Sequence, residues 1–338
     1  MATRNSRRTV VASFVLSTLM AATIASQGAE TGTHTARDAL PYWAFVVNPP
    51  ATESTANAAP VDNAPQHVPG SAVAFTLAQI GDLSNAPDWH PDNHPIMPEV
   101  VAHGRKPDVF ACGYCHLPNG QGRPENSSLA GLPVDYIVQQ VVDFRSGVRK
   151  SSEPKHLPTA YMINIATKAN EQEIRAAAQY FSSLNPRRWI RVVETKTVGK
   201  THVARWMLVP ANTAGNEAIG LRIIETPENL GRTELRDDAS GFIAYVPVGS
   251  IKKGESLVRT GDSGKTVQCA GCHGANLKGA GNAPPIAGRS PSYVVRQLYD
   301  IQSGSRAGVA AQLMEAPVAK LTVSDMVSIA AYTASLQP

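Results

Sequence analysis

Two short motifs hold all four cysteines of this 338-residue sequence, and each has the form Cys-x-x-Cys-His. The first is Cys112-Gly-Tyr-Cys115-His116 and the second is Cys269-Ala-Gly-Cys272-His273. Two thiols at this spacing can add to the two vinyl groups on one edge of a haem, and the imidazole that follows can ligate the iron. The motifs therefore predict two covalently bound haem c groups, with His116 and His273 as iron ligands.

Other uses of paired cysteines fit the sequence less well. A thioredoxin-like pair requires a βαβ setting, which neither pair has. A zinc ribbon places its cysteine pairs roughly 15 to 20 residues apart, whereas these pairs are 157 residues apart. Two local disulfides would suit an oxidising compartment, but they would leave the histidine after each pair without a role.

The motifs belong to an internal repeat. An offset of 157 residues relates Cys112 to Cys269, Tyr136 to Tyr293 and Ser146-Gly147 to Ser303-Gly304. After those glycines the offset falls to 152, which relates Met162 to Met314, because the first copy has five more residues. One offset holds on each side of a single insertion, so the chain contains two copies of one module.

The paired methionines are the expected second axial ligands of the two irons. Met162 and Met314 each lie 24 residues before the proline that closes their module. A thioether opposite an imidazole gives a six-coordinate iron and raises its reduction potential. The alternatives are Met326, which lies inside the last helix, and His156 or Met97 for the first haem, whereas Met207 is expected to pack.

Both modules are expected to be helical. Helices are predicted before the cysteines (98–103 and 254–259), after a proline (133–146 and 291–303) and at the end of each module (170–184 and 322–336). Thr322 and Asp325 form a predicted capping box. Residues 187–250 predict a small antiparallel β insert with strands at 189–194, 203–209, 221–225 and 242–246, and with Trp189 and Trp206 in its core.

The N-terminus predicts export. Residues 1–29 read as a signal peptide, because three arginines precede an uncharged stretch over 9–25 and small residues follow. That stretch is shorter than the about 20 apolar residues of a spanning helix, so a membrane tether through an uncleaved N-terminus is the alternative to a free periplasmic protein. Residues 30–77 are predicted as an N-terminal extension, with Pro-rich linker composition over 48–70 and an aromatic segment at 41–47 that could dock on a folded domain.

Each module resembles a class I cytochrome c domain. The shared features are the Cys-x-x-Cys-His motif, an Ala-Gly pair before the central helix, the methionine, and a last helix ending Ala-x-Tyr-x-x-Ser-Leu. The pair resembles the two-domain dihaem periplasmic electron carriers. This implies a mainly α fold with cytochrome c domains at 78–186 and 251–338 in tandem, joined by the β insert at 187–250. It also implies that Pro285 lies near the second proximal histidine. The extension and the insert depart from the family and put direct pairing of the two domains in question.

The resemblance implies a carrier of single electrons between redox partner proteins, with a dehydrogenase as donor, an oxidase or cytochrome as acceptor and no catalytic residues. The alternatives are a cytochrome subunit of a dehydrogenase or oxidase complex, with the insert and residues 42–47 as docking surfaces, and a dihaem peroxidase. A peroxidase needs an iron with an open sixth position, which the two matched methionines argue against.

Two further features carry less information. The net charge of +4 is too small and too dispersed to predict nucleic-acid binding. His90, His94 and His103 lie in a Pro-rich stretch before the first motif. There we expect hydrogen-bonded histidines packing on the first module, with a metal site or a partner surface as the alternative.

Overall fold

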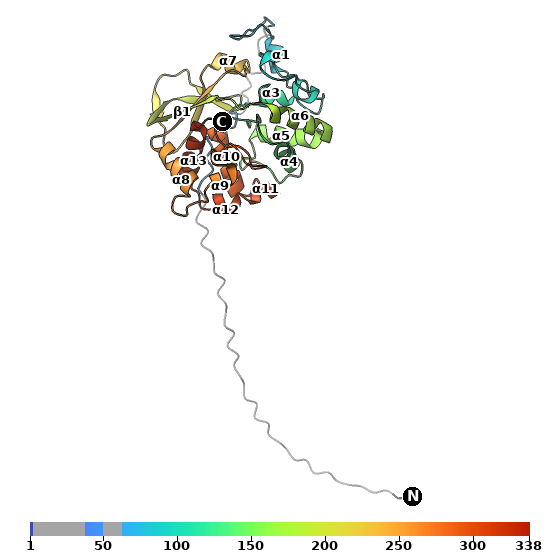
Figure 1. Cartoon of the computed structure of the whole chain (residues 1–338), viewed down its shortest axis with the longest axis vertical. Helices are drawn as coiled ribbons and strands as arrows, with labels where there is room; N and C mark the ends of the chain where they lie inside the picture. The colour runs from blue at the N-terminus through green and yellow to red at the C-terminus, as the bar shows by residue number, and fades with distance from the viewer. Residues whose placement is uncertain (3–37, 50–62) are drawn as a thin grey trace. The chain divides into compact units, whose positions relative to one another are not determined.

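The structure, a computed structural model, describes residues 1–2, 38–49 and 63–338. The signal peptide predicted for residues 1–29 therefore lies outside the described residues except for its first two. In the described part of the chain, no helix is long and apolar enough to cross a membrane. The described residues from Asp38 onward form a compact unit in which both modules and the insert pack together (Figure 1).

The first module is built from short helices around a small apolar core. Its elements are α1 (Leu77–Gly81), the 3-10 helix η2 (Pro91–Asn93), α2 (Glu99–Ala102), α3 (Cys112–His116), α4 (Val134–Arg145), α5 (Leu157–Lys168) and α6 (Glu171–Ser183). Helix α6 begins at a capping box in which Asn170 and Glu173 each accept a hydrogen bond from the other's backbone N–H. The helices predicted at 98–103, 133–146 and 170–184 are confirmed as α2, α4 and α6.

The second module repeats this plan with one difference. Its elements are α8 (Ser250–Thr260), α9 (Ala270–His273), α10 (Pro291–Gln302), α11 (Val309–Gln312), α12 (Glu315–Val318) and α13 (Val323–Ser335). The predicted capping box of Thr322 and Asp325 is confirmed. The long helix α5, which the sequence analysis did not predict, is replaced here by the short helices α11 and α12. The reason is that Pro158 lies in the first turn of α5, where proline is tolerated, whereas Pro317 lies too far along to allow one continuous helix.

Helices α8 and α13 cross at a glycine. A Cβ added to Gly254 would lie 1.9 Å from the backbone oxygen of Ser328 and 2.7 Å from the Cβ of Tyr332. The absence of a side chain at this residue therefore allows the two helices to approach closely. Met326, on α13, is fully buried in the core of this module, so it packs there as a core side chain.

The insert contains strands β1 (Ile190–Thr195), β2 (Thr197–Gly199), β3 (Thr201–Ala204), β4 (Met207–Pro210), β5 (Asn216–Ala218), β6 (Ile224–Pro227) and β7 (Phe242–Pro247), with helix α7 (Leu230–Glu234). The prediction that the insert is antiparallel throughout is wrong, because β1 pairs in parallel with β7 in a sheet of order β1-β7-β6. The single strand predicted at 203–209 is also wrong. The chain reverses at Arg205 and Trp206, which have φ angles of 48° and 67°, and forms the hairpin β3–β4.

Two segments before the first module also pack on the folded unit. Ala44 and Phe45 are buried, and the Phe45 ring contacts both His156 and Tyr299 edge-on at centroid distances of 6.2 and 6.0 Å. Residues 63–76, which fall within the extension predicted at 30–77, pair with themselves at Gln66 and Phe75 and pack against Trp89. The aromatic segment at 41–47 therefore docks on its own chain, and the buried Phe45 offers no surface to a partner.

The two modules touch directly, so the insert does not separate them. The backbone N–H of Lys150 donates to the oxygen of Ser305, and that of Ala307 donates to the oxygen of Val148, both at 2.7 Å. Next to these bonds, Arg149 of the first module donates to Tyr293 and Gln297 of the second at 3.2 and 3.1 Å.

The equivalent arginine of the second module makes the corresponding hydrogen bonds to the first module. Arg306 lies 157 residues after Arg149, so the first repeat offset extends two residues past the glycines. Arg306 donates to Tyr136 and Gln140 of the first module at 3.0 and 2.7 Å. Each arginine also bonds the glutamine of its own module, at 2.9 Å for Arg149 and 3.0 Å for Arg306. We call these six residues the arginine exchange. It relates the modules by a local two-fold symmetry.

Candidate haem-binding sites

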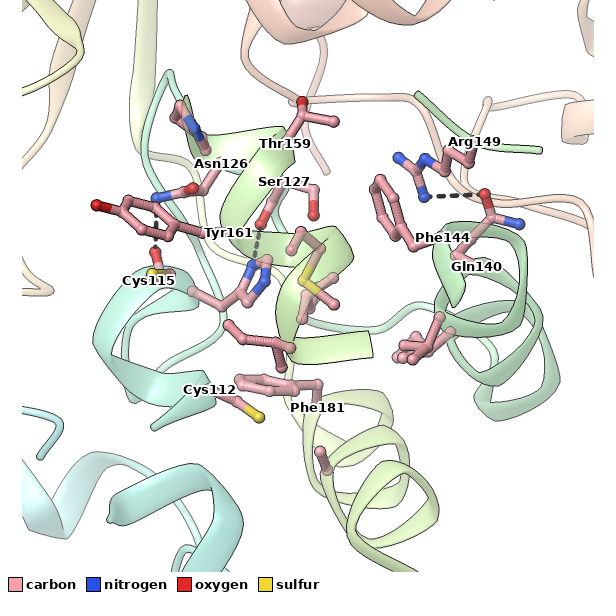
Figure 2. Close-up of a pocket in the computed structure, with 18 of the residues that line it drawn as sticks. Cys112, Cys115, Asn126, Ser127, Gln140, Phe144, Arg149, Thr159, Tyr161 and Phe181 are labelled. Atoms are coloured by element: carbon pink, nitrogen blue, oxygen red, sulfur yellow. Dashed lines mark hydrogen bonds between the residues drawn. The ribbon is translucent and has the colours of Figure 1, made fainter. Parts of the chain in front are cut away.

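Helix α3 presents the first motif at the wall of a cavity in the first module. Cys112, Cys115 and His116 all line this cavity. The His116 Nδ1 lies 2.9 Å from the backbone oxygen of Ser127 (Figure 2). That bond fixes the ring and leaves Nε2 as the nitrogen available to a metal. Burial lowers the pKa of His116, so the imidazole is held in the neutral form that ligates iron.

Met162, on α5, lines the same cavity as His116. The structure therefore brings together the two cysteines, the histidine and the methionine that the sequence assigned to one haem. His156, the alternative ligand, lines the cavity too. Its Nδ1 lies 2.9 Å from the Thr159 hydroxyl, and burial lowers its pKa to about 3.

The chemistry of the cavity wall fits a haem. Much of its wall is apolar, including Leu132, Ile137, Phe144, Ile165 and Phe181. Other parts of the wall are polar and cationic, because Arg149, Arg236 and Arg296 also line the cavity. A haem has a flat apolar ring with two carboxylates on one edge, so it requires both kinds of wall.

Buried polar atoms without partners support the same fit. Among the described residues, Nε2 of His156 and Nε1 of Trp206 are buried without a hydrogen-bond partner, and both residues line the cavity. Buried groups of this kind are rare in folded proteins. These two unpartnered atoms indicate that the cavity binds a ligand with polar groups.

The second motif is more exposed than the first. His273 is buried, and its Nδ1 lies 2.8 Å from the backbone oxygen of Pro284, the residue equivalent to Ser127. The neighbour of Pro285, rather than Pro285 itself, therefore orients this histidine. Cys269 and Met314 pack on the edge of the second module's core, whereas Cys272 is exposed. Met314 lies between α11 and α12, at a break between helices rather than inside one.

All four cysteines are free thiols, so the structure contains neither of the local disulfides considered above. Burial raises the pKa of Cys112 to about 12 and that of Cys269 to about 11. Such thiols are poor nucleophiles at neutral pH. Raised pKa values therefore do not suit a redox-active pair.

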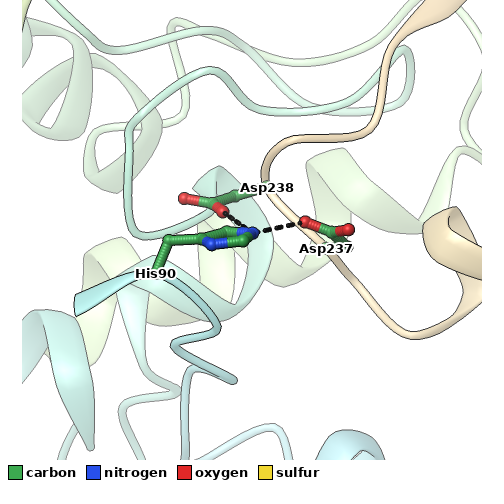
Figure 3. A group of neighbouring side chains, drawn as sticks. All are labelled: His90, Asp237 and Asp238. Atoms are coloured by element: carbon green, nitrogen blue, oxygen red, sulfur yellow. Dashed lines mark hydrogen bonds and ion pairs between the residues drawn. The ribbon is translucent and has the colours of Figure 1, made fainter. Parts of the chain in front are cut away.

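The histidines before the first motif have protein partners. The His90 Nε2 lies 3.0 Å from Asp237 and 3.9 Å from Asp238 (Figure 3). His94 lies 3.1 Å from Asp88, and His103 lies 2.8 Å from Asn85. The expectation of hydrogen-bonded histidines is confirmed, with the difference that His90 contacts the insert rather than the first module. Trp89 reinforces this contact by donating to the backbone oxygen of Leu235 at 2.8 Å.

The insert also supplies cavity residues that the sequence analysis missed. Arg236 stacks on the Tyr114 ring at 3.8 Å and donates to the Tyr114 backbone oxygen. Trp206 was predicted for the core of the insert, but it lines the cavity of the first module. Trp189 and Met207 are buried in the insert as predicted. Residues 203–209 were expected to form one strand. A turn predicted at Arg205 and Trp206 would have placed the Trp206 side chain outside the core of the insert.

The chain is similar to known cytochromes. Residues 251–337 match the cytochrome c family. The chain is 25% identical over 234 residues to a thiosulfate dehydrogenase electron acceptor from Thiomonas intermedia, covering 68% of this chain and 80% of that protein. It is 24% identical over 230 residues to cytochrome c4 of Pseudomonas aeruginosa, covering 67% and 83%. A solved cytochrome c4 from Acidithiobacillus ferrooxidans superposes with a TM-score of 0.43 at 20% identity, over 67% of this chain and 98% of that one.

Proposed function

Because the second module is a cytochrome c domain and the chain is related to the dihaem class I cytochromes c, we propose that it carries single electrons between redox proteins outside the cytoplasm. The observation that carries the proposal is the meeting of Cys112, Cys115, His116 and Met162 at one largely apolar cavity. In this proposal Cys269, Cys272, His273 and Met314 hold the second haem in the equivalent way. Bound haem supplies a reversible one-electron couple at each site.

The residues of this chain would orient the iron ligands and tune the reduction potential of each haem. The carbonyls of Ser127 and Pro284 orient the two imidazoles. Apolar side chains exclude water from the first site, and the buried guanidinium of Arg149 adds positive charge there. Positive charge near an iron disfavours its oxidised state, so these groups act to raise the potential of the first haem.

The contact between the modules supports electron exchange within the molecule. The arginine exchange and the two backbone bonds beside it fix one module against the other. This packing would keep the distance between the two haem sites constant. An electron accepted at one site could then leave from the other. We expect a dehydrogenase as donor and an oxidase or another cytochrome as acceptor.

The second candidate function is a stable cytochrome subunit of a dehydrogenase. The names of two relatives favour it: the Thiomonas protein is an electron acceptor of thiosulfate dehydrogenase, and a cytochrome subunit of sulfide dehydrogenase from Chlorobaculum tepidum is 42% identical over 41 residues. Those residues cover 12% of this chain and 37% of that protein.

The experiment that tests the proposal begins with the exported protein. Its intact mass should exceed that of the apo chain by two haems, and a redox titration should show two one-electron steps. Purification from the native periplasm and membrane then separates the two functions. A free carrier should elute alone and be reduced by an added dehydrogenase fraction, whereas a subunit should co-purify with its dehydrogenase in a fixed ratio. A chain without covalent haem would refute both.

A further inference from the structure

The β insert contributes Trp206 and Arg236 to the wall of the first haem cavity, and Trp206 is the one whose polar atom has no partner among the described residues. This residue lies at the turn of the hairpin β3–β4, more than twenty residues after helix α6 ends. Its φ of 67° lies in a region that bulky side chains rarely adopt. A residue persists there only when its surroundings hold it in place.

The surroundings of Trp206 do hold it. Its backbone N–H donates to the side chain of Asn48 at 2.8 Å. The next residue, Met207, is buried, and its sulfur lies 2.9 Å from the Arg123 guanidinium of the first module. The Trp206 ring contacts the ring of Tyr161 edge-on, with 5.7 Å between centroids, and Tyr161 precedes the proposed iron ligand Met162. Groups from the extension and the first module thus fix a side chain of the insert at the cavity wall.

The orientation leaves one polar atom without a partner. The Trp206 Nε1 is buried and forms no hydrogen bond with any described residue. An indole N–H can only donate, so its missing partner is an acceptor. The proposed occupant of this cavity has two carboxylates, and carboxylates are the strongest acceptors that such a donor can meet.

We propose that Trp206 is a positioning residue for the first haem, in which the insert supplies an indole N–H that donates a hydrogen bond to one haem carboxylate. This rests on the proposed function, because it requires a haem in the first cavity. Trp206 lies at the cavity that holds the first motif, so the contact would act on the first haem. The inserted domain thereby becomes part of the first redox site.

The consequence for the haem follows from charge. A donated hydrogen bond partly neutralises a carboxylate and stabilises its ionised form. Without the donor, the carboxylate would hold its proton more tightly and would exert more negative charge on the iron when ionised. The potential of the first haem should then fall, and its pH dependence should move to higher pH.

The test compares the haem-loaded Trp206→Phe protein with the wild type. Phenylalanine keeps an aromatic ring against Tyr161 but removes the N–H. We expect one of the two potentials to fall while the other stays unchanged, and the pH at which that potential varies to rise by about one unit, a tenfold change in proton affinity. Met162→Ala identifies which step belongs to the first haem. Trp189→Phe is the matched control, because Trp189 packs on Phe242 inside the insert and does not line the cavity.

A second measurement uses the reduced wild-type protein and does not depend on the variant folding. The indole N–H of Trp206 should exchange slowly with D2O and show nuclear Overhauser contacts to the carboxylate-bearing side chains of one haem. If both haems are attached but Trp206→Phe changes neither potential, or this N–H shows no such contact, the inference is wrong and the proposed function stands. If no haem is attached, the proposed function itself fails.

Discussion

Replacing Gly254 with alanine tests the close crossing of helices α8 and α13 in the second module. The added Cβ would lie 1.9 Å from the Ser328 backbone oxygen, on the helix that crosses α8. Ordinary contact is about 3.5 Å, so the two helices would have to separate by roughly 1.5 Å. Overpacking of this kind costs about 1–3 kcal/mol and sometimes more, whereas alanine favours the helix by about 1 kcal/mol. A backbone oxygen cannot move aside as a side chain can, so we take the upper end of the cost and expect a net loss of about 2 kcal/mol.

The assay is guanidinium unfolding of the oxidised, haem-loaded protein, followed by far-ultraviolet circular dichroism and by haem absorbance. The matched control is Gly81→Ala, where an added Cβ meets nothing within 4 Å and only the helix preference changes. The control should be neutral or slightly stabilising. If Gly254→Ala unfolds with the same free energy as the wild type, the close crossing of α8 and α13 does not exist and the reasoning fails.

Three other predictions concern the iron ligands, the arginine exchange and the His94–Asp88 pair before the first motif. Replacing Met162 or Met314 with alanine should halve the near-infrared sulfur-to-iron band of the oxidised protein and open one iron to carbon monoxide; an undiminished band would show that the residue is not a ligand. Arg149→Met should lower the free energy of unfolding by about 3 kcal/mol, because it removes three hydrogen bonds from a buried interface, and a loss below about 0.5 kcal/mol would contradict the contact between the modules. The hydrogen bond that His94 donates to the Asp88 carboxylate raises the pKa of His94, so this pair stabilises the fold fully below the unfolded-state pKa of about 6.5 and loses its contribution as pH rises through the folded value. The stability difference between wild type and His94→Gln should therefore shrink above neutral pH, and a difference that is constant or grows would refute the stabilising role of the His94–Asp88 pair.

The helices of the modules could be predicted because each has local signals. Helix α13 begins at a capping box and α10 begins at a proline, and both signals are visible in the sequence. Helix α5 was missed because apolar residues cover most of its circumference, which gives no clear helical period. The strands β1 and β7 could be located but not paired, since their parallel pairing joins segments more than forty residues apart through a crossover that no local pattern records.

The residues of the candidate site could be predicted where they form a local or repeated pattern, as for the helices. The Cys-x-x-Cys-His motifs and the matched methionines are contiguous or repeated patterns, so they could be assigned from the sequence. Arg149 and Arg306 also share the repeat offset, but an isolated arginine in a sequence resembles a surface charge. Only the fold shows that the two lie together at the contact between the modules. Trp206 had no repeat partner at all, and its place at the cavity depends on a turn that the sequence does not mark.

The arginine exchange also limits how this protein could be divided or recombined. Each guanidinium takes two of its acceptors from the opposite copy, so a module cut out alone would incur the penalty of losing those bonds and exposing the surface that they join. Grafting one module onto an unrelated partner would meet the same penalty unless the graft brought a tyrosine and a glutamine to the same place. The duplicated modules have therefore become mutually dependent, and a change on one side of this contact has to be matched on the other for both to persist.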